Sequence, residues 1–137
     1  MPADREHFDL APGFHASAVA CGLKPGGALD LALISTDGPC AAAGVFTTNR
    51  VQAAPVLYDR EVLGRNAAGI RAVIANAGCA NACTGERGMA AARHMAALTA
   101  RLLGCEPDQV LVLSTGVIGR HLDTEKVARG IAALGSR

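Results

Sequence analysis

Residues 114–119, with the sequence STGVIG, combine the residue types that acyl-transfer chemistry uses to stabilise negative charge. They directly follow the apolar run VLVL, which predicts a strand. A strand that breaks into Thr115-Gly116 can present a hydroxyl and a backbone N–H side by side, and glycine lets a reacting atom approach the backbone closely. Two such donors form an oxyanion hole. An ordinary strand-to-loop turn has the same pattern, and the pattern alone favours the turn.

A second candidate is the loop of residues 76–85, with the sequence NAGCANACTG. Its small residues allow close packing, and the side chains of Asn76 and Asn81 can hydrogen-bond to the backbone of the loop. The loop could form the wall of an active site between a strand and a helix. It could equally be a purely structural loop, and the residues leave both interpretations open.

The remaining reactive groups give weaker patterns. The four histidines lack the spacing of metal ligands, and the pair Cys79 and Cys83 has no second pair to complete four ligands. Cys83 would precede a helix, a common place for a reactive thiol, but no histidine is placed by the sequence to activate it. Neither a P-loop nor a dinucleotide fingerprint is present. We therefore expect neither a metal nor a cofactor.

The elements that must position these groups begin with a predicted hairpin. Residues 29–35 are an apolar run of strand length, Asp37-Gly38-Pro39 would turn the chain, and residues 41–48 would form the partner strand. Residues 51–58 could add a third strand that ends near Pro55.

Two buried strands and a long helix are expected further along the chain. Residues 71–75 (RAVIA) and 110–114 (VLVLS) are short and apolar without alternation, which is typical of buried strands. A helix is predicted over residues 86–103, with Thr84 as its N-terminal cap and Gly104 at its end.

A last helix would begin at Asp123 or Thr124, because Val127, Ile131 and Leu134 then fall on one face. Strands that cluster first and then alternate with helices indicate an α/β fold with sheet layers covered by helices.

The composition bounds the class of protein. A length of 137 residues predicts a single domain over residues 1–137. Apolar residues make up 50% of the chain and aromatic residues only 3%, so small aliphatic side chains must fill the core. Charged residues amount to 18%, below the usual quarter. A surface with so few charges suggests that a partner covers part of it.

Several function classes are excluded on the same grounds. A net charge of +1 without a cluster of Lys and Arg indicates no nucleic-acid partner. No apolar run approaches the length of a membrane span, and the charged first ten residues do not form a secretory signal. Five cysteines at irregular spacing argue against a disulfide framework. We therefore expect a cytoplasmic protein.

Five blocks that occur in order resemble the amino-terminal part of the ornithine acetyltransferase family, the glutamate N-acetyltransferases of arginine biosynthesis. The resemblance covers about residues 13–135, and five ordered blocks make it more specific than any single motif. The blocks are residues 30–34 (DLALI), 44–49 (GVFTTN), 53–56 (AAPV), 76–85 (NAGCANACTG) and 114–119 (STGVIG).

The resemblance implies a self-cleaving precursor with an α/β sandwich fold. Members of this family cut themselves into an α chain and a β chain, and the new amino-terminal threonine of the β chain is the nucleophile. It accepts acetyl from N-acetylornithine and passes it to glutamate, and bifunctional members also use acetyl-CoA. The free α-amine can act as the base. The family works without metal or cofactor and assembles as α2β2.

Carried over residue by residue, Thr115 and Gly116 match the pair that stabilises the oxyanion, through the hydroxyl and the backbone N–H respectively. In the family's pattern the nucleophile lies beyond Arg137. The chain therefore resembles the α-chain part and alone is expected to be inactive. Two alternatives are a non-catalytic partner-binding domain and part of an N-terminal-nucleophile hydrolase of the same fold, in which water accepts the acyl group.

The loop of residues 76–85 departs from the family's usual sequence. Where members read Asn-Ser-Gly-Asn-Ala-Asn-Ala, this chain has Ala77 in place of the serine and Cys79 in place of the second asparagine. A hydroxyl and an amide are thus missing, which puts a polar role of these two positions in doubt and leaves room for a different acyl donor or acceptor.

Overall fold

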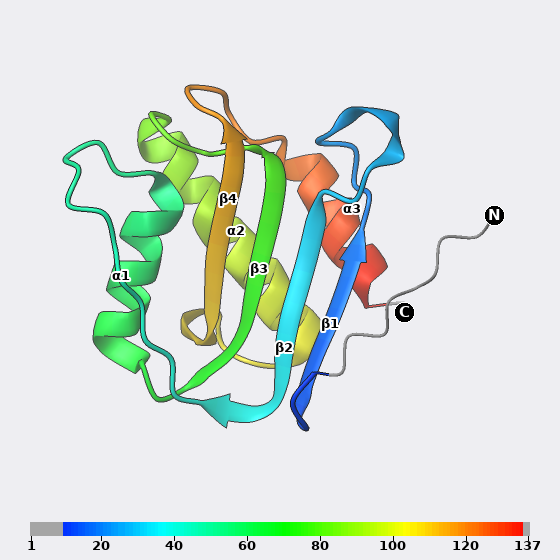
Figure 1. Cartoon of the computed structure of the whole chain (residues 1–137), viewed down its shortest axis with the longest axis vertical. Coiled ribbons are helices and arrows are strands. Elements are labelled where there is room, and N and C mark those ends of the chain that lie inside the picture. The colour runs from blue at the N-terminus through cyan, green and yellow to red at the C-terminus, as the bar shows by residue number, and fades with distance from the viewer. Residues whose placement is uncertain (1–9, 136–137) are drawn as a thin grey trace.

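The computed structural model describes residues 10–135, which form one four-stranded sheet and three α-helices (Figure 1). The strands are β1 (Phe14–Val19), β2 (Leu31–Cys40), β3 (Ile70–Cys79) and β4 (Val110–Val117). The helices are α1 (Ala54–Asn66), α2 (Gly85–Leu103) and α3 (Thr124–Leu134), with short 3-10 helices η1 (Pro25–Gly27) and η2 (Pro107–Gln109).

The strands lie in the order β1-β2-β3-β4. β2 pairs antiparallel with both of its neighbours, whereas β3 and β4 are parallel and are connected through α2. Figure 1 shows α2 and α3 behind the sheet and α1 beside β4. The helices thus cover one face of the sheet, which confirms the predicted α/β fold with a sheet covered by helices.

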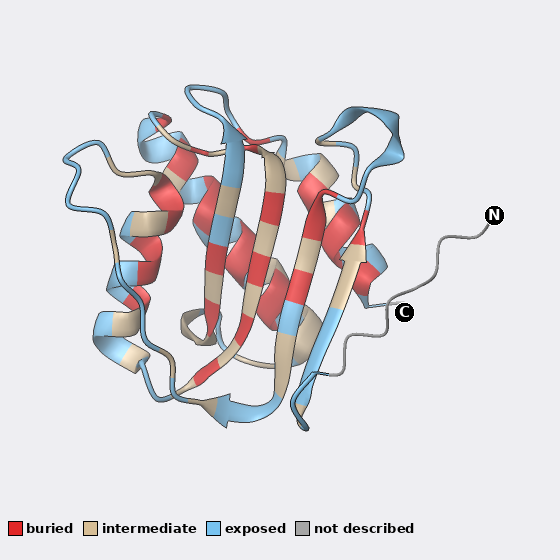
Figure 2. Ribbon diagram, viewed as in Figure 1, coloured by how far each residue is buried: buried red, intermediate tan, exposed pale blue. Residues whose placement is uncertain are grey.

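Small aliphatic side chains build the core between the sheet and the helices. Ile70, Ala72 and Ile74 are the buried alternate residues of β3, and Figure 2 shows the same alternation along the neighbouring strands. α2 contributes Met95 and a row of alanines to this core, all of them buried. Because alanine side chains are short, the helix can lie close to the sheet.

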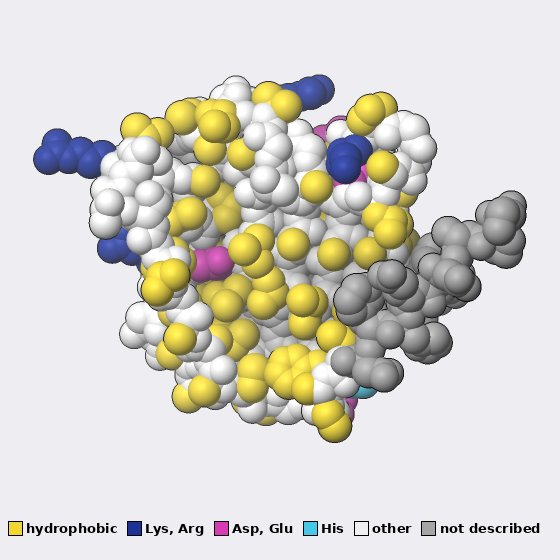
Figure 3. Space-filling model, in the orientation of Figure 1, with side chains coloured by type: hydrophobic (Ala, Val, Ile, Leu, Met, Phe, Trp, Pro, Cys, Tyr) yellow, Lys and Arg dark blue, Asp and Glu magenta, His cyan; other side chains and the backbone are white. Residues whose placement is uncertain are grey.

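The opposite face of the sheet carries no helix among the described residues. We call it the open sheet face and define it by two rows of side chains that the strand register places across the sheet. Ile34 is 45% exposed and Leu113 is 50% exposed on this face. Figure 3 shows hydrophobic side chains gathered over it. The two rows are Ala16, Ile34, Val73 and Leu111, and Ala18, Ala32, Ala75 and Leu113.

The predicted hairpin of residues 29–35 with residues 41–48 is wrong. β2 pairs instead with the preceding β1, and residues 41–53 form no strand. The stretch around Gly38 does not turn the chain back, but continues β2 with a shift in register between Ser35 and Cys40. Bulges of this kind absorb irregular residues without ending a strand.

The predicted third strand over residues 51–58 is also wrong, because α1 begins at Ala54. Pro55 lies in the first turn of this helix, where a missing N–H is tolerated. Tyr58 and Val62, one helical turn apart, are both buried, so the apolar residues of this segment follow a helical period.

The other predicted helices and strands are confirmed, but β3 and β4 extend beyond the predicted residues 71–75 and 110–114, to Cys79 and Val117. Gly104 closes α2 in the left-handed conformation with φ of 66°. Thr84 occupies the N-cap position, but its hydroxyl donates to the Asn81 side chain and does not cap the helix. α3 begins after Asp123, whose carboxylate accepts a hydrogen bond from the Lys126 N–H at 3.1 Å. Within residues 10–135, no helix is both long and apolar enough to span a membrane.

Candidate functional site

The structure brings together the two segments that the sequence singles out. In the parallel pairing of β3 and β4, Thr115 lies opposite Ala77 and Gly116 lies opposite Gly78. Residues 76–79 and 114–117 therefore run side by side as the last paired residues of β3 and β4, so the predicted loop of residues 76–85 begins only after Cys79. They meet at the carboxyl ends of two parallel strands, the edge of a sheet at which ligands of α/β proteins commonly bind.

Gly116 is required by a close approach of two backbones. Its φ is 131°, a value that other residues rarely adopt. A Cβ atom at this position would collide with the backbone of Gly78 and would lie 2.6 Å from the Cys79 nitrogen. Gly78 itself has a φ of 109°. The two glycines thus let the backbones of β3 and β4 approach each other at a distance that a side chain would not permit.

The Thr115 side chain is accessible on the open sheet face. It lines a cavity of about 200 Å³ whose walls include the short side chains of Ala18, Ala32 and Ala77. Within residues 10–135 the Thr115 hydroxyl makes no hydrogen bond, so its donor and acceptor capacity is available to a ligand. This arrangement can present a hydroxyl to a bound acyl group.

Asp30 lines the same cavity and organises the turn that precedes it in the sequence. Its carboxylate is 3% exposed and accepts hydrogen bonds from the N–H groups of Cys21 at 2.6 Å, Gly22 at 3.1 Å and Lys24 at 2.9 Å. Burial by itself would raise the pKa of Asp30, but these donors outweigh it and hold the pKa below its usual range. The carboxylate therefore stays charged.

The turn that Asp30 holds packs against Gly78. A Cβ atom on Gly78 would lie 3.1 Å from the carbonyl oxygen of Leu23, so Gly78 is confined between this turn and Gly116. Sequence reasoning missed the role of Asp30. The signal was a lone carboxylate at the start of the apolar run DLALI, where a buried charge needs several donors.

Among residues 10–135, Cys83 and the histidines do not form a reactive pair. Cys83 is exposed at the start of α2, and no histidine lines the pocket beside it. Among residues 10–135 no three His, Cys, Asp or Glu side chains are grouped so that they could hold a metal ion.

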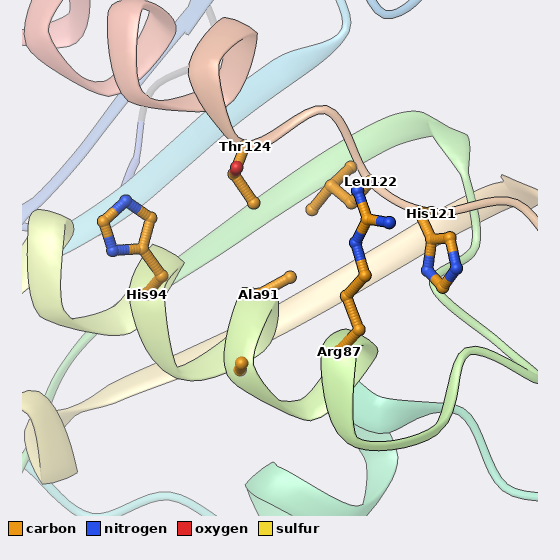
Figure 4. Close-up of a pocket in the computed structure, with 7 residues that line it drawn as sticks. Arg87, Ala91, His94, His121, Leu122 and Thr124 are labelled. Atoms are coloured by element: carbon orange, nitrogen blue, oxygen red, sulfur yellow. The ribbon is translucent and has the colours of Figure 1, made fainter.

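A second cavity, of about 430 Å³, lies between α2 and the start of α3 (Figure 4). Arg87, His94 and His121 line it, and in Figure 4 the side chains of Arg87 and His121 lie beside each other. This cavity belongs to the helical side of the molecule. It includes neither Thr115 nor the open sheet face.

Fold and site together define an α/β domain with a free hydroxyl and a glycine at the carboxyl end of a parallel strand pair. The ArgJ family model matches residues 15–137. The chain therefore belongs to the ArgJ family, which confirms the family resemblance of its five sequence blocks.

Two curated relatives show how much of such a protein the chain represents. It is 56% identical over 119 residues to the arginine biosynthesis bifunctional protein ArgJ of Thermotoga neapolitana. The matched region covers 87% of this chain and 30% of the relative. It is 52% identical over 136 residues to the ArgJ protein of Gloeobacter violaceus, covering 96% of this chain and 33% of the relative. The chain thus spans about a third of their length.

Solved structures share the fold. The ArgJ crystal structure from Bacillus halodurans superposes with a TM-score of 0.84 at 39% identity, covering 88% of this chain and 62% of that one. The ornithine acetyltransferase of Mycobacterium tuberculosis, solved in complex with ornithine, gives a TM-score of 0.87 at 45% identity, covering 92% and 67% respectively.

Proposed function

We propose that this protein supplies the oxyanion-stabilising α-chain part of an acetyltransferase that moves acetyl from N-acetylornithine to glutamate. The observation that carries the proposal is the Thr115–Gly116 pair, with an unbonded hydroxyl beside a close approach of the β3 and β4 backbones at the end of β4. Support comes from the names of the relatives and from the Mycobacterium tuberculosis neighbour, which was solved with ornithine.

The pair would act when the carbonyl of the acetyl group is attacked. The nucleophilic threonine of the β chain would bond to the acetyl carbon while its proton passes to its own free α-amine. The carbonyl oxygen then becomes an oxyanion, to which the Thr115 hydroxyl and the Gly116 N–H donate. Collapse of this intermediate breaks the C–N bond, ornithine leaves with the proton, and the acetyl-threonine remains for the amine of glutamate.

The β chain is the partner that this proposal requires. We infer that it arises by self-cleavage of a precursor and that two copies of each chain assemble as α2β2. The open sheet face supports this inference, because exposed Ile34 and Leu113 form part of an apolar surface suited to burial against another chain.

The relatives' description as bifunctional supports acetyl-CoA as a further acetyl donor for glutamate. The proposal places the protein in the cytoplasm and assigns it no cofactor.

The proposal is tested with Thr115→Ala in the complete protein, assayed with N-acetylornithine and glutamate. Loss of one oxyanion donor is expected to lower kcat about 10²- to 10³-fold. Thr115→Ser, which keeps the hydroxyl, serves as the matched control and should stay within about tenfold of the unmodified protein. An unchanged kcat for Thr115→Ala would refute the assigned role.

The two alternatives predict other outcomes of the same assay. A hydrolase would release acetate from N-acetylornithine at the same rate with and without glutamate. A non-catalytic binding domain would form no acetyl-threonine, which intact mass of the protein incubated with N-acetylornithine would show.

A further inference from the structure

Asn76 lies on β3, immediately before the residue opposite Thr115, and is only 3% exposed. It is in register with Ser114, the residue before Thr115. Because side chains alternate along a strand, buried Asn76 and its partner Ser114 point toward the helices, whereas exposed Thr115 points onto the open sheet face. By this alternation the Asn76 side chain lies on the helical side of the sheet, although Asn76 also lines the cavity that Thr115 lines.

Two hydrogen bonds use both ends of the Asn76 amide. Its Nδ2 donates to the Cys79 carbonyl oxygen at 2.9 Å, and its Oδ1 accepts from the Ser114 hydroxyl at 2.6 Å. A carbonyl oxygen can only accept, so the NH2 group must face Cys79 and the amide oxygen must face Ser114. The first bond lies within the last four residues of β3. The second ties this end of β3 to β4.

Further hydrogen bonds connect the two segments beyond Gly116. The Cys79 thiol donates to the Arg120 carbonyl oxygen at 3.2 Å, and the Gly119 N–H donates to the Ala82 carbonyl oxygen at 2.8 Å. The segment after Thr115 is thus fixed to the segment after Asn76 at several points. Asn76 bonds through its side chain to both strands.

We propose that Asn76 is a positioning residue for the Thr115–Gly116 pair. By tying the end of β3 to Ser114, its amide sets the position of the Thr115 hydroxyl relative to the Gly116 N–H. Both groups must reach a single oxygen atom, with donor distances of about 2.7–3.1 Å. This inference rests on the proposed function, because it needs the pair to act on an oxyanion.

Two substitutions release the two bonds separately in the complete protein. Ser114→Ala removes the donor to Asn76 and leaves the bond to Cys79 in place. Asn76→Asp keeps an acceptor for Ser114 but sets an oxygen against the Cys79 carbonyl. We expect kcat to fall about threefold to tenfold for Ser114→Ala, because this factor corresponds to the free energy of one hydrogen bond. For Asn76→Asp we expect kcat to fall about 100-fold, which is the loss that a misplaced catalytic group can cause. KM for N-acetylornithine should stay unchanged.

A double-mutant cycle separates positioning from simple stabilisation. In a Thr115→Ala background there is no hydroxyl left to position, so most of the effect of Ser114→Ala on kcat should disappear. A residue that only stabilises the fold would lower kcat by the same factor in both backgrounds. Ser114→Ala keeps this test usable even where Asn76→Asp fails to fold.

Thr99→Val is the matched control for Ser114→Ala. The Thr99 hydroxyl is buried on α2 and donates to the Met95 carbonyl oxygen at 2.9 Å, so the substitution also removes one buried hydroxyl bond. It should leave kcat unchanged.

Three results are distinguishable. A costly Thr115→Ala together with a non-additive loss at Ser114 supports the inference. A costly Thr115→Ala with unchanged or additive effects at Ser114 overturns the inference but leaves the proposed function standing. A harmless Thr115→Ala refutes both.

Discussion

Asp59 is a carboxylate that the fold buries without a cation at ion-pair distance among residues 10–135. It lies on α1, is 8% exposed, and its Oδ1 accepts a hydrogen bond from the Val112 N–H at 2.8 Å. Burial raises the pKa of Asp59 to about 6, although the bond from Val112 acts in the opposite direction. The folded protein therefore holds this proton more tightly than the unfolded chain does.

Because the pKa of Asp59 is raised on folding, its contribution to stability is fully present below about pH 4 and is lost as pH rises toward 6. Asp59→Asn removes this titration and keeps an acceptor for Val112. The variant should be more stable than the unmodified protein by up to about 2 kcal/mol at pH 8, and the difference should vanish near pH 4. Urea unfolding at a series of pH values measures both.

Glu61→Gln is the control, because Glu61 lies on the same helix but is exposed and paired with Arg65 and Arg93 on the surface. Its effect should be below about 1 kcal/mol. A constant difference between Asp59→Asn and the unmodified protein from pH 4 to pH 8 would contradict the prediction.

At the residue scale, the sequence was enough to propose a role for Thr115 and Gly116. It was not enough to predict the close contact between Gly116 and another backbone segment. We expected glycine to admit a reacting atom. The structure shows that it also admits the backbone of Gly78, 38 positions earlier in the chain. Sequence carries no register between distant strands, so this contact could not be predicted.

At the element scale, local patterns were sufficient where they coincide with capping residues. α2 and α3 were predictable because Gly104 and Asp123 mark their ends. α1 was not predicted, because Pro55 suggested the end of a strand. The helical spacing of Tyr58 and Val62 becomes clear only once the structure shows that both are buried. β1 was hidden among glycines and prolines, and its pairing with β2 is a tertiary contact.

The cap of α3 gives a prediction at this scale. Asp123 accepts from the Lys126 N–H and lies 3.8 Å from the Lys126 ammonium. Asp123→Ala removes both interactions and should lower the free energy of unfolding by about 1 kcal/mol. Asp123→Asn keeps the cap but loses the ion pair, and should cost much less, because exposed ion pairs contribute little. Equal losses for the two variants, measured by urea unfolding, would show that the ion pair matters more than the cap.

For the whole molecule, the open sheet face is the surface on which the proposed function places the β chain. Ile34 lies near its middle and is 45% exposed, so a charged side chain there remains hydrated in the separate chain. Ile34→Glu should leave the fold intact but weaken association with the β chain by at least about 2 kcal/mol, or about 30-fold in Kd, because a charge would be buried without a partner. Native mass measurements of the complex test this.

Ala97→Glu, on an exposed position of α2, is the control and should leave the complex unchanged. Dissociation by both substitutions, or by neither, would show that the open sheet face does not carry the partner.

The bond from Val112 to Asp59 also bears on aggregation. β4 is an end strand of the sheet in the order β1-β2-β3-β4, and end strands offer unpaired N–H groups on which a foreign strand can grow. Asp59 occupies one of these donors from the adjacent helix, and a carboxylate placed there opposes an incoming row of carbonyl oxygens. We therefore expect the same buried charge that reduces stability at neutral pH to hinder the pairing of a foreign strand with β4, the strand that carries Thr115.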